Sequence, residues 1–194
     1  EIASCLVGSE MCIRDSPELD DAAVWEKICL IDTENESGSL YVGKQIAGVI
    51  VGEYLTINLE APYSAARYLE AIDLAEQAGV EYLVIDSLSH AWTGEGGLLD
   101  VQGNVAKRSG NSYTAWREVT PLHNKLVDRI LQCPMHVAVT LRTKTEYVIE
   151  DNGSGKKTPR KIGMAPVFRD GVEYEFTIFF ELDQSHAAAA TKDR

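Results

Sequence analysis

Asp86 follows a short, unbroken apolar run over residues 82–85. Such a run, with β-branched residues, is typical of a parallel strand that is buried on both faces. A carboxylate at the carboxyl end of such a strand lies where open α/β sheets bind their ligands. In nucleotide hydrolases, a carboxylate at this place helps to hold the Mg²⁺ ion that bridges two phosphates. The alternative is that Asp86 or Ser87 only caps a following helix.

Two further buried strands are predicted over residues 27–33 and 135–140, and both end in polar groups. These groups are Asp32 and Glu34 at the end of the first strand, and Thr140 and Arg142 at the end of the second. Phosphoryl transfer needs such groups to converge: one carboxylate holds Mg²⁺, a second orients or deprotonates water, and a polar residue senses the γ-phosphate. Each strand end taken alone could equally be a cap or a solvated turn.

The order of the elements around these groups predicts an α/β fold. Pro62 opens a helix that runs to about residue 77 with apolar residues at helical spacing, and Gly79 closes it. This helix follows the strand at 27–33 and a short strand at 54–59, and it precedes the strand at 81–86. Strand, helix and strand in this order predict parallel strands joined by a right-handed crossover.

The second half of the chain is expected to add one long helix and several strands. A glycine-rich turn at residues 94–97 leads into a polar segment that ends at Asn111. Ser112 is predicted to cap a helix that runs to about residue 132 and bends at Pro121. Antiparallel strands over residues 173–182 and 186–191 are expected to close the chain.

The first sixteen residues differ in character from the rest. Residues 4–16 resemble a translated sequencing-adapter read-through, so we expect 1–16 to be a non-native leader and exclude it from the fold. The alternative is a genuine short strand and turn. Residues 17–194 then form one partial domain, which begins with a short acidic helix near residues 17–25.

Composition limits the classes of function. The 18 basic and 30 acidic residues give a net charge of −12, which argues against a broadly basic nucleic-acid-binding surface but leaves room for a local basic patch. No apolar run approaches the roughly 20 residues of a membrane helix. The four cysteines show no CxxC or other metal-binding spacing and are expected to be reduced thiols of an intracellular protein.

A basic segment follows the third polar strand end. Within residues 142–161, six basic side chains stand against three acidic ones, and a flexible tip is expected at residues 151–155. The basic residues are Arg142, Lys144, Lys156, Lys157, Arg160 and Lys161. A hairpin or mobile loop that contacts a nucleic-acid backbone is one interpretation, and a solvated hairpin is the other.

These features together resemble a known family. From about residue 27 to residue 194 the chain resembles the RecA-like AAA-family ATPases common in bacteriophage genomes. The most specific match is Ser87-Leu88-Ser89-His90-Ala91-Trp92 after the central strand. Further matches are Ile31-Asp32-Thr33-Glu34, Gly94, Gly96-Gly97-Leu98-Leu99, Ala115-Trp116, Pro134, His136, Arg142, Lys144, Pro166 and Glu173-Tyr174-Glu175-Phe176.

The resemblance implies a RecA-like (P-loop NTPase) core and a set of roles. Asp86 would be the Mg²⁺ ligand and, with Ser87, would bind ATP, while Glu34 would activate water. Thr140 and Arg142 would sense the γ-phosphate. The nucleic-acid contacts would be made by Lys144, Lys156, Lys157, Arg160 and Lys161, and Lys192 and Arg194 would reach a neighbouring subunit's nucleotide. The resemblance implies two partners, which are single-stranded DNA and further copies of the chain. It also implies a location in the cytoplasm of a bacterial host and no contact with a membrane.

One essential motif of this family is missing. The sequence contains no G-x-x-x-x-G-K-[ST] loop, whose backbone N–H groups would cradle the phosphates. The nearest match, residues 38–45, ends in Gln45, which cannot replace the metal-binding hydroxyl, and we interpret it as a coincidence. The phosphate-binding strand and loop are therefore expected upstream, and the chain as written is expected to be inactive. A non-catalytic DNA-binding or annealing module on the same scaffold is the alternative.

Overall fold

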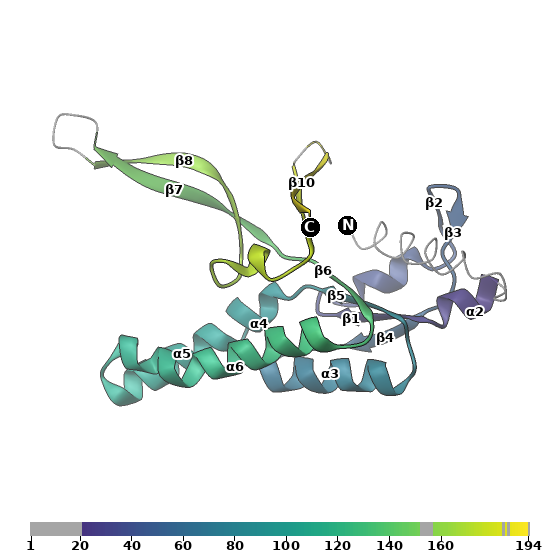
Figure 1. Cartoon of the computed structure of the whole chain (residues 1–194), viewed down its shortest axis with the longest axis horizontal. Coiled ribbons are helices and arrows are strands. Elements are labelled where there is room, and N and C mark those ends of the chain that lie inside the picture. The colour runs from purple at the N-terminus through teal and green to yellow at the C-terminus, as the bar shows by residue number, and fades with distance from the viewer. Residues whose placement is uncertain (1–20, 152–156, 184, 186, 194) are drawn as a thin grey trace.

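The computed structural model describes residues 21–151, 157–183, 185 and 187–193. Its centre is a four-stranded sheet in the order β4-β1-β5-β6, and every pair in it is parallel (Figure 1). The strands are β1 (Ile28–Asp32), β4 (Leu55–Asn58), β5 (Tyr82–Asp86) and β6 (His136–Val139). The predicted α/β fold with a parallel sheet, flanking helices and antiparallel C-terminal strands is confirmed.

The two faces of the sheet are covered by different elements. Alternate side chains of β1 and β5, among them Ile31 and Ile85, enter the larger core together with helices α3 (Ala65–Gln77) and α6 (Ser112–Gln132). Leu30 and Val84 point to the opposite face, where α2 (Asp21–Trp25) supplies Trp25. This burial on both faces explains why the strands appear in the sequence as continuous apolar runs.

The segments between and after the sheet strands form small separate elements. A 3₁₀ helix, η1 (Ser37–Tyr41), and a short hairpin of β2 (Gln45–Ile46) and β3 (Val49–Ile50) lie between β1 and β4. The antiparallel pair β7 (Thr143–Asp151) and β8 (Lys157–Pro166) extends away from the body of the molecule (Figure 1). The chain closes with η2 (Val172–Tyr174), β9 (Ile178–Leu182) and β10 (Ala188–Asp193), of which β9 and β10 pair antiparallel.

Several sequence-based expectations need correction. The supposed polar segment after the glycine-rich turn contains the helix α5 (Leu98–Ser109), which packs against α6 and follows the short helix α4 (Ser89–Thr93). Asn111, not Ser112, caps α6, because its side chain accepts from the backbone N–H groups of Tyr113 and Thr114. Helix α6 contains Pro121 and continues through it. The strand predicted from residue 173 begins only at Ile178, after η2.

Some of the expected elements lie partly or wholly outside the residues that the structure describes. The hairpin predicted for the basic segment is confirmed over β7 and β8, and its tip at 152–156 lies outside the described residues, as do the expected leader at 1–16 and the start of the short N-terminal helix. Cys29 and Cys133 are free thiols, and burial raises the pKa of Cys29 to about 12. None of the helices in the described part of the chain is long and apolar enough to cross a membrane.

Gly38 allows η1 to lie directly on β1. A Cβ atom built at this position would meet Leu30 Cδ2 at 2.1 Å, whereas one built at Gly103, within α5, would meet nothing within 4 Å. We therefore predict that Gly38→Ala lowers the free energy of unfolding by about 1–3 kcal/mol through overpacking. Gly103→Ala is the matched control and should raise it by about 0.5–1 kcal/mol, because alanine favours a helix interior. Urea unfolding of both variants measures this, and equal effects would show that η1 does not pack on β1 in this way.

Candidate active site

The register of the sheet brings three strand ends together. Asp32 pairs with Asp86 in β1 and β5, and Ile85 pairs with Val139 in β5 and β6. Backbone hydrogen bonds continue past the strands: the Thr33 N–H donates to the Asp86 carbonyl (2.7 Å), and the Thr140 N–H donates to the Ile85 carbonyl (3.0 Å). The polar residues that follow β1, β5 and β6 therefore lie at one edge of the sheet.

Asp32 organises the turn after β1. Its carboxylate is buried, with 2% exposure, and accepts from two backbone N–H groups, those of Glu34 (2.7 Å) and Gly38 (2.9 Å). Two backbone donors compensate the charge of a carboxylate that is removed from water. Asp32 therefore has a structural role, which is to fix the position of Glu34.

Asp86 and Thr140 form a contact between the second and third strand ends. Both residues are 9% exposed, and the Thr140 hydroxyl donates to Asp86 Oδ1. The peptide bond between Asp86 and Ser87 is cis. The sequence-based prediction placed these two side chains at neighbouring strand ends, and the structure brings them into direct contact.

Thr33 links the first two strand ends through its hydroxyl. It accepts from the Ser87 N–H (2.8 Å) and lies 2.7 Å from His90 Nδ1. The Ser87 carbonyl in turn accepts from the hydroxyl of Tyr68 on α3 (2.9 Å). Thr33, Tyr68 and His90 were not among the predicted site residues, although Thr33 and His90 stand in the two motifs that carry the resemblance.

Glu34 is held by Arg142 from across the site. Arg142 Nε donates to Glu34 Oε1 (2.9 Å), and Arg142 Nη2 donates to Glu34 Oε2. The Ser87 hydroxyl also donates to Oε1 (3.2 Å). Both oxygens of the carboxylate are thus engaged in a fork of the kind that arginine forms with carboxylates and phosphates.

The charges of this cluster act on one another. Burial raises the pKa of Glu34, but the hydrogen bond and charge of Arg142, with smaller effects of His90 and Ser87, outweigh it and lower that pKa below its ordinary value. Burial and the charge of Arg142 lower the pKa of His90, and the charge of Glu34 opposes them less strongly. His90 also stacks on Tyr63, with ring centroids 4.7 Å apart. At neutral pH the site therefore holds an ionised Glu34 and a neutral His90.

Comparison with known proteins assigns the chain to a family. A family model described as an AAA domain matches residues 20–194. The chain belongs to this AAA domain family. No curated protein and no solved structure matches it. Membership supports an ATPase-like, nucleotide-binding function, for which Mg²⁺ is the usual companion ion.

The donors of this AAA domain fit Mg²⁺ only as part of a nucleotide complex. Among the described residues there is no group of three or more His, Cys, Asp and Glu that could hold a metal ion by itself. Mg²⁺ usually keeps several waters and is bound by one or two carboxylates together with substrate phosphates. Asp86, beside the Thr140 hydroxyl at a strand end, suits such a site.

The near-match to a phosphate-binding loop does not have the required local structure. Residues 38–45 form most of η1 and run into β2, so no α-helix follows the glycines. A phosphate loop needs the N-terminus of a helix directly after it, because the free N–H groups there bind the anion. The structure thus agrees with the interpretation of this match as a coincidence.

The remaining predicted site residues lie apart from the strand ends. Lys144 is exposed on β7, and Lys157, Arg160 and Lys161 lie on β8, where the structure describes the backbone only. Lys192 Nζ donates to the backbone carbonyls of Glu173 (3.1 Å) and Tyr174 (2.5 Å), so this cation stabilises the turn around η2. Lys156 and Arg194 lie outside the described residues.

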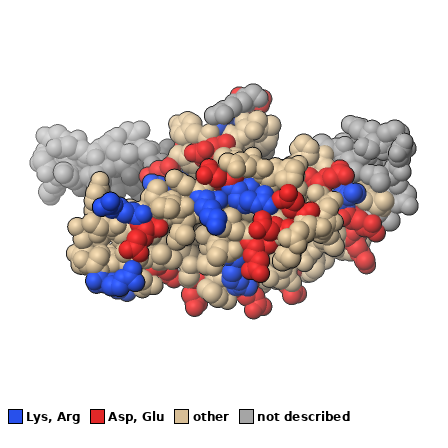
Figure 2. Space-filling view, turned by 60° about the horizontal axis from the view of Figure 1, so that its bottom comes forward, with Lys and Arg blue, Asp and Glu red and all other residues tan. Residues whose placement is uncertain are grey.

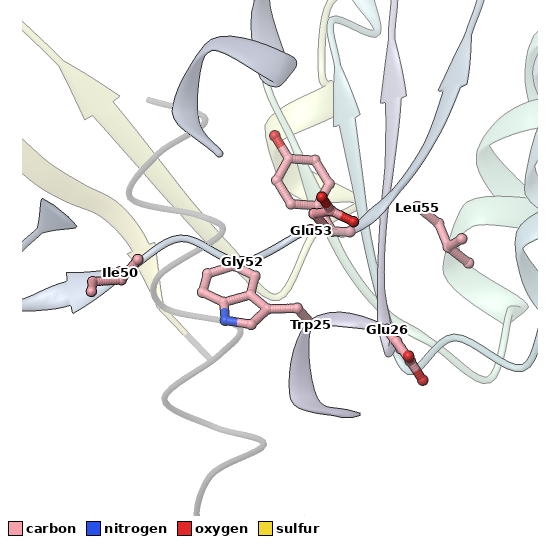
Figure 3. Close-up of a pocket in the computed structure, with 7 residues that line it drawn as sticks. Trp25, Glu26, Ile50, Gly52, Glu53 and Leu55 are labelled. Carbon is pink, nitrogen blue, oxygen red and sulfur yellow. The ribbon is translucent and has the colours of Figure 1, made fainter. Parts of the chain in front are cut away.

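A cleft of about 680 Å³ lies elsewhere in the AAA domain. Trp25 and Glu26, which precede β1, line it together with the segment from Gly52 to Leu55 that leads into β4 (Figure 3). These segments lie at the amino ends of the strands, opposite the cluster of Asp86 and Glu34. The cleft therefore does not form part of the candidate active site.

Proposed function

We propose that this chain supplies the metal-binding and water-activating half of a RecA-like, Mg²⁺-dependent ATPase site. The observation that carries the proposal is the convergence of Glu34, Asp86, Thr140 and Arg142 at one edge of the parallel sheet, where ligands of open α/β sheets bind. Membership in the AAA domain family supports the same chemistry.

The side chains divide the work of phosphoryl transfer. A Mg²⁺ ion held at this site would supply positive charge that offsets the charge of the phosphates. Asp86 provides its protein ligand, and the hydroxyl of Thr140 fixes the orientation of that carboxylate. Glu34 orients or deprotonates the attacking water, for which an ionised carboxylate is required. Arg142, on the third strand end, senses the γ-phosphate and stabilises the charge that develops on it.

The phosphate cradle of such a site must come from outside residues 17–194. The sequence lacks a phosphate-binding loop, and the anionic Asp86 and Glu34 would repel a polyphosphate without its N–H donors and lysine. We therefore propose that the chain as written binds ATP weakly or not at all. A non-catalytic DNA-binding or annealing module remains the alternative function, and absence of turnover in a protein with an intact cradle would favour it.

Calorimetric titration with Mg²⁺-ATP tests whether the chain needs a phosphate cradle from elsewhere, and variants test the roles of Glu34 and Asp86. The chain as written should show no micromolar binding of Mg²⁺-ATP. A version in which the native upstream segment replaces residues 1–16 should bind it. In that version, Glu34→Gln should keep binding and reduce turnover at least 100-fold, since it removes the base but keeps the size. Asp86→Asn should weaken the Mg²⁺-dependent part of binding. Normal turnover by Glu34→Gln, or micromolar binding by the chain as written, would contradict the assignment.

We also propose that the β7–β8 hairpin contacts single-stranded DNA. The process would be recombination or replication of a bacteriophage genome in the bacterial cytoplasm, and several copies of the chain would act together. The hairpin extends from the body (Figure 1), and its segment is basic in an otherwise acidic chain. Figure 2 shows basic and acidic side chains interspersed over the visible face of the body, so that face offers no broad basic surface. The hairpin is the better candidate for contacts to a phosphate backbone.

The salt dependence of binding tests the role of the hairpin. Replacing Lys156, Lys157, Arg160 and Lys161 by Ala should weaken binding of an oligothymidylate and flatten the decrease of affinity with salt, because fewer counterions are released. A control variant loses four positive charges from α5 and α6 in place of the hairpin, and it should bind the oligothymidylate like the parent. Its substitutions to Ala are at Lys107, Arg108, Arg117 and Lys125. Equal affinities and slopes for parent and hairpin variant would refute the contact.

A further inference from the structure

His90 lies at the edge of the candidate active site, on the short helix that follows β5. It is the second residue of α4, four positions after Asp86. Its ring stacks on that of Tyr63, with centroids 4.7 Å apart and the two planes 20° from parallel. The charges of Glu34 and Arg142 both act on the ring. The ring of His90 is therefore held beside the polar strand ends.

The hydroxyl of Thr33 has one hydrogen and two acceptors within reach. It accepts from the Ser87 N–H (2.8 Å), so its own hydrogen is free to go to either acceptor. His90 Nδ1 lies 2.7 Å away, whereas the Ser87 carbonyl lies 3.3 Å away and already accepts from the hydroxyl of Tyr68 (2.9 Å). Hydroxyl donors usually lie about 2.7–2.8 Å from their acceptors. The Thr33 hydroxyl is therefore best placed to donate to His90 Nδ1.

This hydrogen bond fixes the tautomer of His90. A neutral imidazole carries one hydrogen, so a ring whose Nδ1 accepts holds its hydrogen on Nε2. Burial and the charge of Arg142 lower the pKa of His90, which favours the neutral ring at neutral pH. The ring thus has one defined donor, the Nε2–H group.

The Nε2 atom of His90 is open to solvent. It makes no hydrogen bond within the part of the chain that the structure describes. It is also not one of the enclosed side-chain atoms of that part that lack a partner, which are Ser37 Oγ and His123 Nε2. Nε2 of His123 is enclosed where its ring packs against Trp92 and Phe168. His90 therefore has a donor that a ligand can reach, and His123 does not.

The tautomer restricts what His90 can bind. With its hydrogen on Nε2 and its Nδ1 lone pair engaged by Thr33, the ring has no lone pair left for Mg²⁺, which in any case prefers oxygen ligands. It can only donate, so its ligand must be an acceptor. The nearby positive charge of Arg142 favours an anionic acceptor in the same place. In the proposed site, the acceptors of this kind are the phosphate oxygens of the nucleotide.

We propose that His90 is a further phosphate ligand, whose Nε2–H donates to a phosphate oxygen of the bound nucleotide and whose tautomer is set by the Thr33 hydroxyl. This inference rests on the proposed function and adds two residues to its site. His90 touches the substrate, and Thr33 is a positioning residue that acts through His90. The Thr33 hydroxyl also joins this donor to the backbone of Ser87, directly after Asp86.

Long-range ¹H–¹⁵N spectra of the histidine-labelled chain test the tautomer without any nucleotide. At neutral pH His90 should carry a hydrogen on Nε2 and none on Nδ1. Thr33→Val keeps the shape of the side chain but removes the hydroxyl, and it should shift the His90 nitrogens toward a mixture of both tautomers. Thr33→Ser should restore the parent spectrum. A hydrogen on Nδ1 in the parent, or identical spectra of the parent and Thr33→Val, would overturn the role of Thr33.

The phosphate contact is tested in the version in which the native upstream segment replaces residues 1–16. A non-hydrolysable ATP analogue with Mg²⁺ should shift the Nε2 resonance of His90 and leave that of the enclosed His123 unchanged. His90→Phe keeps a ring beside Tyr63 but removes the donor, and it should weaken binding of the analogue about 10-fold in calorimetry. His90→Gln carries an amide N–H close to the position of Nε2 and should recover most of this loss.

The outcomes separate this inference from the function on which it rests. Binding of the analogue with an unchanged Nε2 resonance of His90, or with equal affinities of the parent and His90→Phe, would overturn the phosphate contact and leave the proposed function intact. Absence of binding would contradict the phosphate cradle of the proposed function and, with it, the phosphate ligand of His90. The role of Thr33 in setting the tautomer is decided by the spectra of the chain alone.

Discussion

The parallel register of β1 with β5 is the constraint on which the site depends. It sets Asp32 beside Asp86 and places three strand ends, with their polar residues, at one edge of the sheet. Strands buried on both faces leave no room for polar groups along their length, so such groups gather where the strands end. A shift of the β1–β5 register would separate Glu34 from Arg142, and a shift of the β5–β6 register would separate Asp86 from Thr140.

The surroundings of three neighbouring carboxylates distinguish their roles. Asp32 is compensated by two backbone N–H groups and holds a turn in place. Asp86 accepts from the hydroxyl of Thr140, and its charge acts on Arg142. Glu34 is matched by the full positive charge of Arg142.

The sequence predicted those parts of the structure that local patterns determine. The apolar runs indicated β1, β5 and β6, and the residue types after them indicated Asp86, Glu34, Thr140 and Arg142. Helix α5 was missed because residues 98–109 carry many polar residues and an internal glycine, and its helical form depends on packing of Leu98 and Val105 and on α6.

Contacts between distant residues could not be predicted in the same way. The Thr33 hydroxyl meets His90 across 57 positions of sequence, and Arg142 meets Glu34 across 108. No pattern of apolar spacing encodes such pairs, because they depend on how loops follow the strand ends. The cleft beside Trp25 and Gly52 likewise arises only from the packing of segments that lie apart in the sequence, at the amino ends of β1 and β4.

The most direct test of the account locates a bound metal–nucleotide complex on the sheet. Paramagnetic broadening by Mn²⁺-ATP can be measured on the version in which the native upstream segment replaces residues 1–16. The account predicts the strongest loss of amide signal at Glu34, Asp86 and Thr140, and much weaker loss at Ile28 and Tyr82 at the amino ends of β1 and β5. Strongest broadening at those amino ends, beside the cleft lined by Trp25, would contradict it.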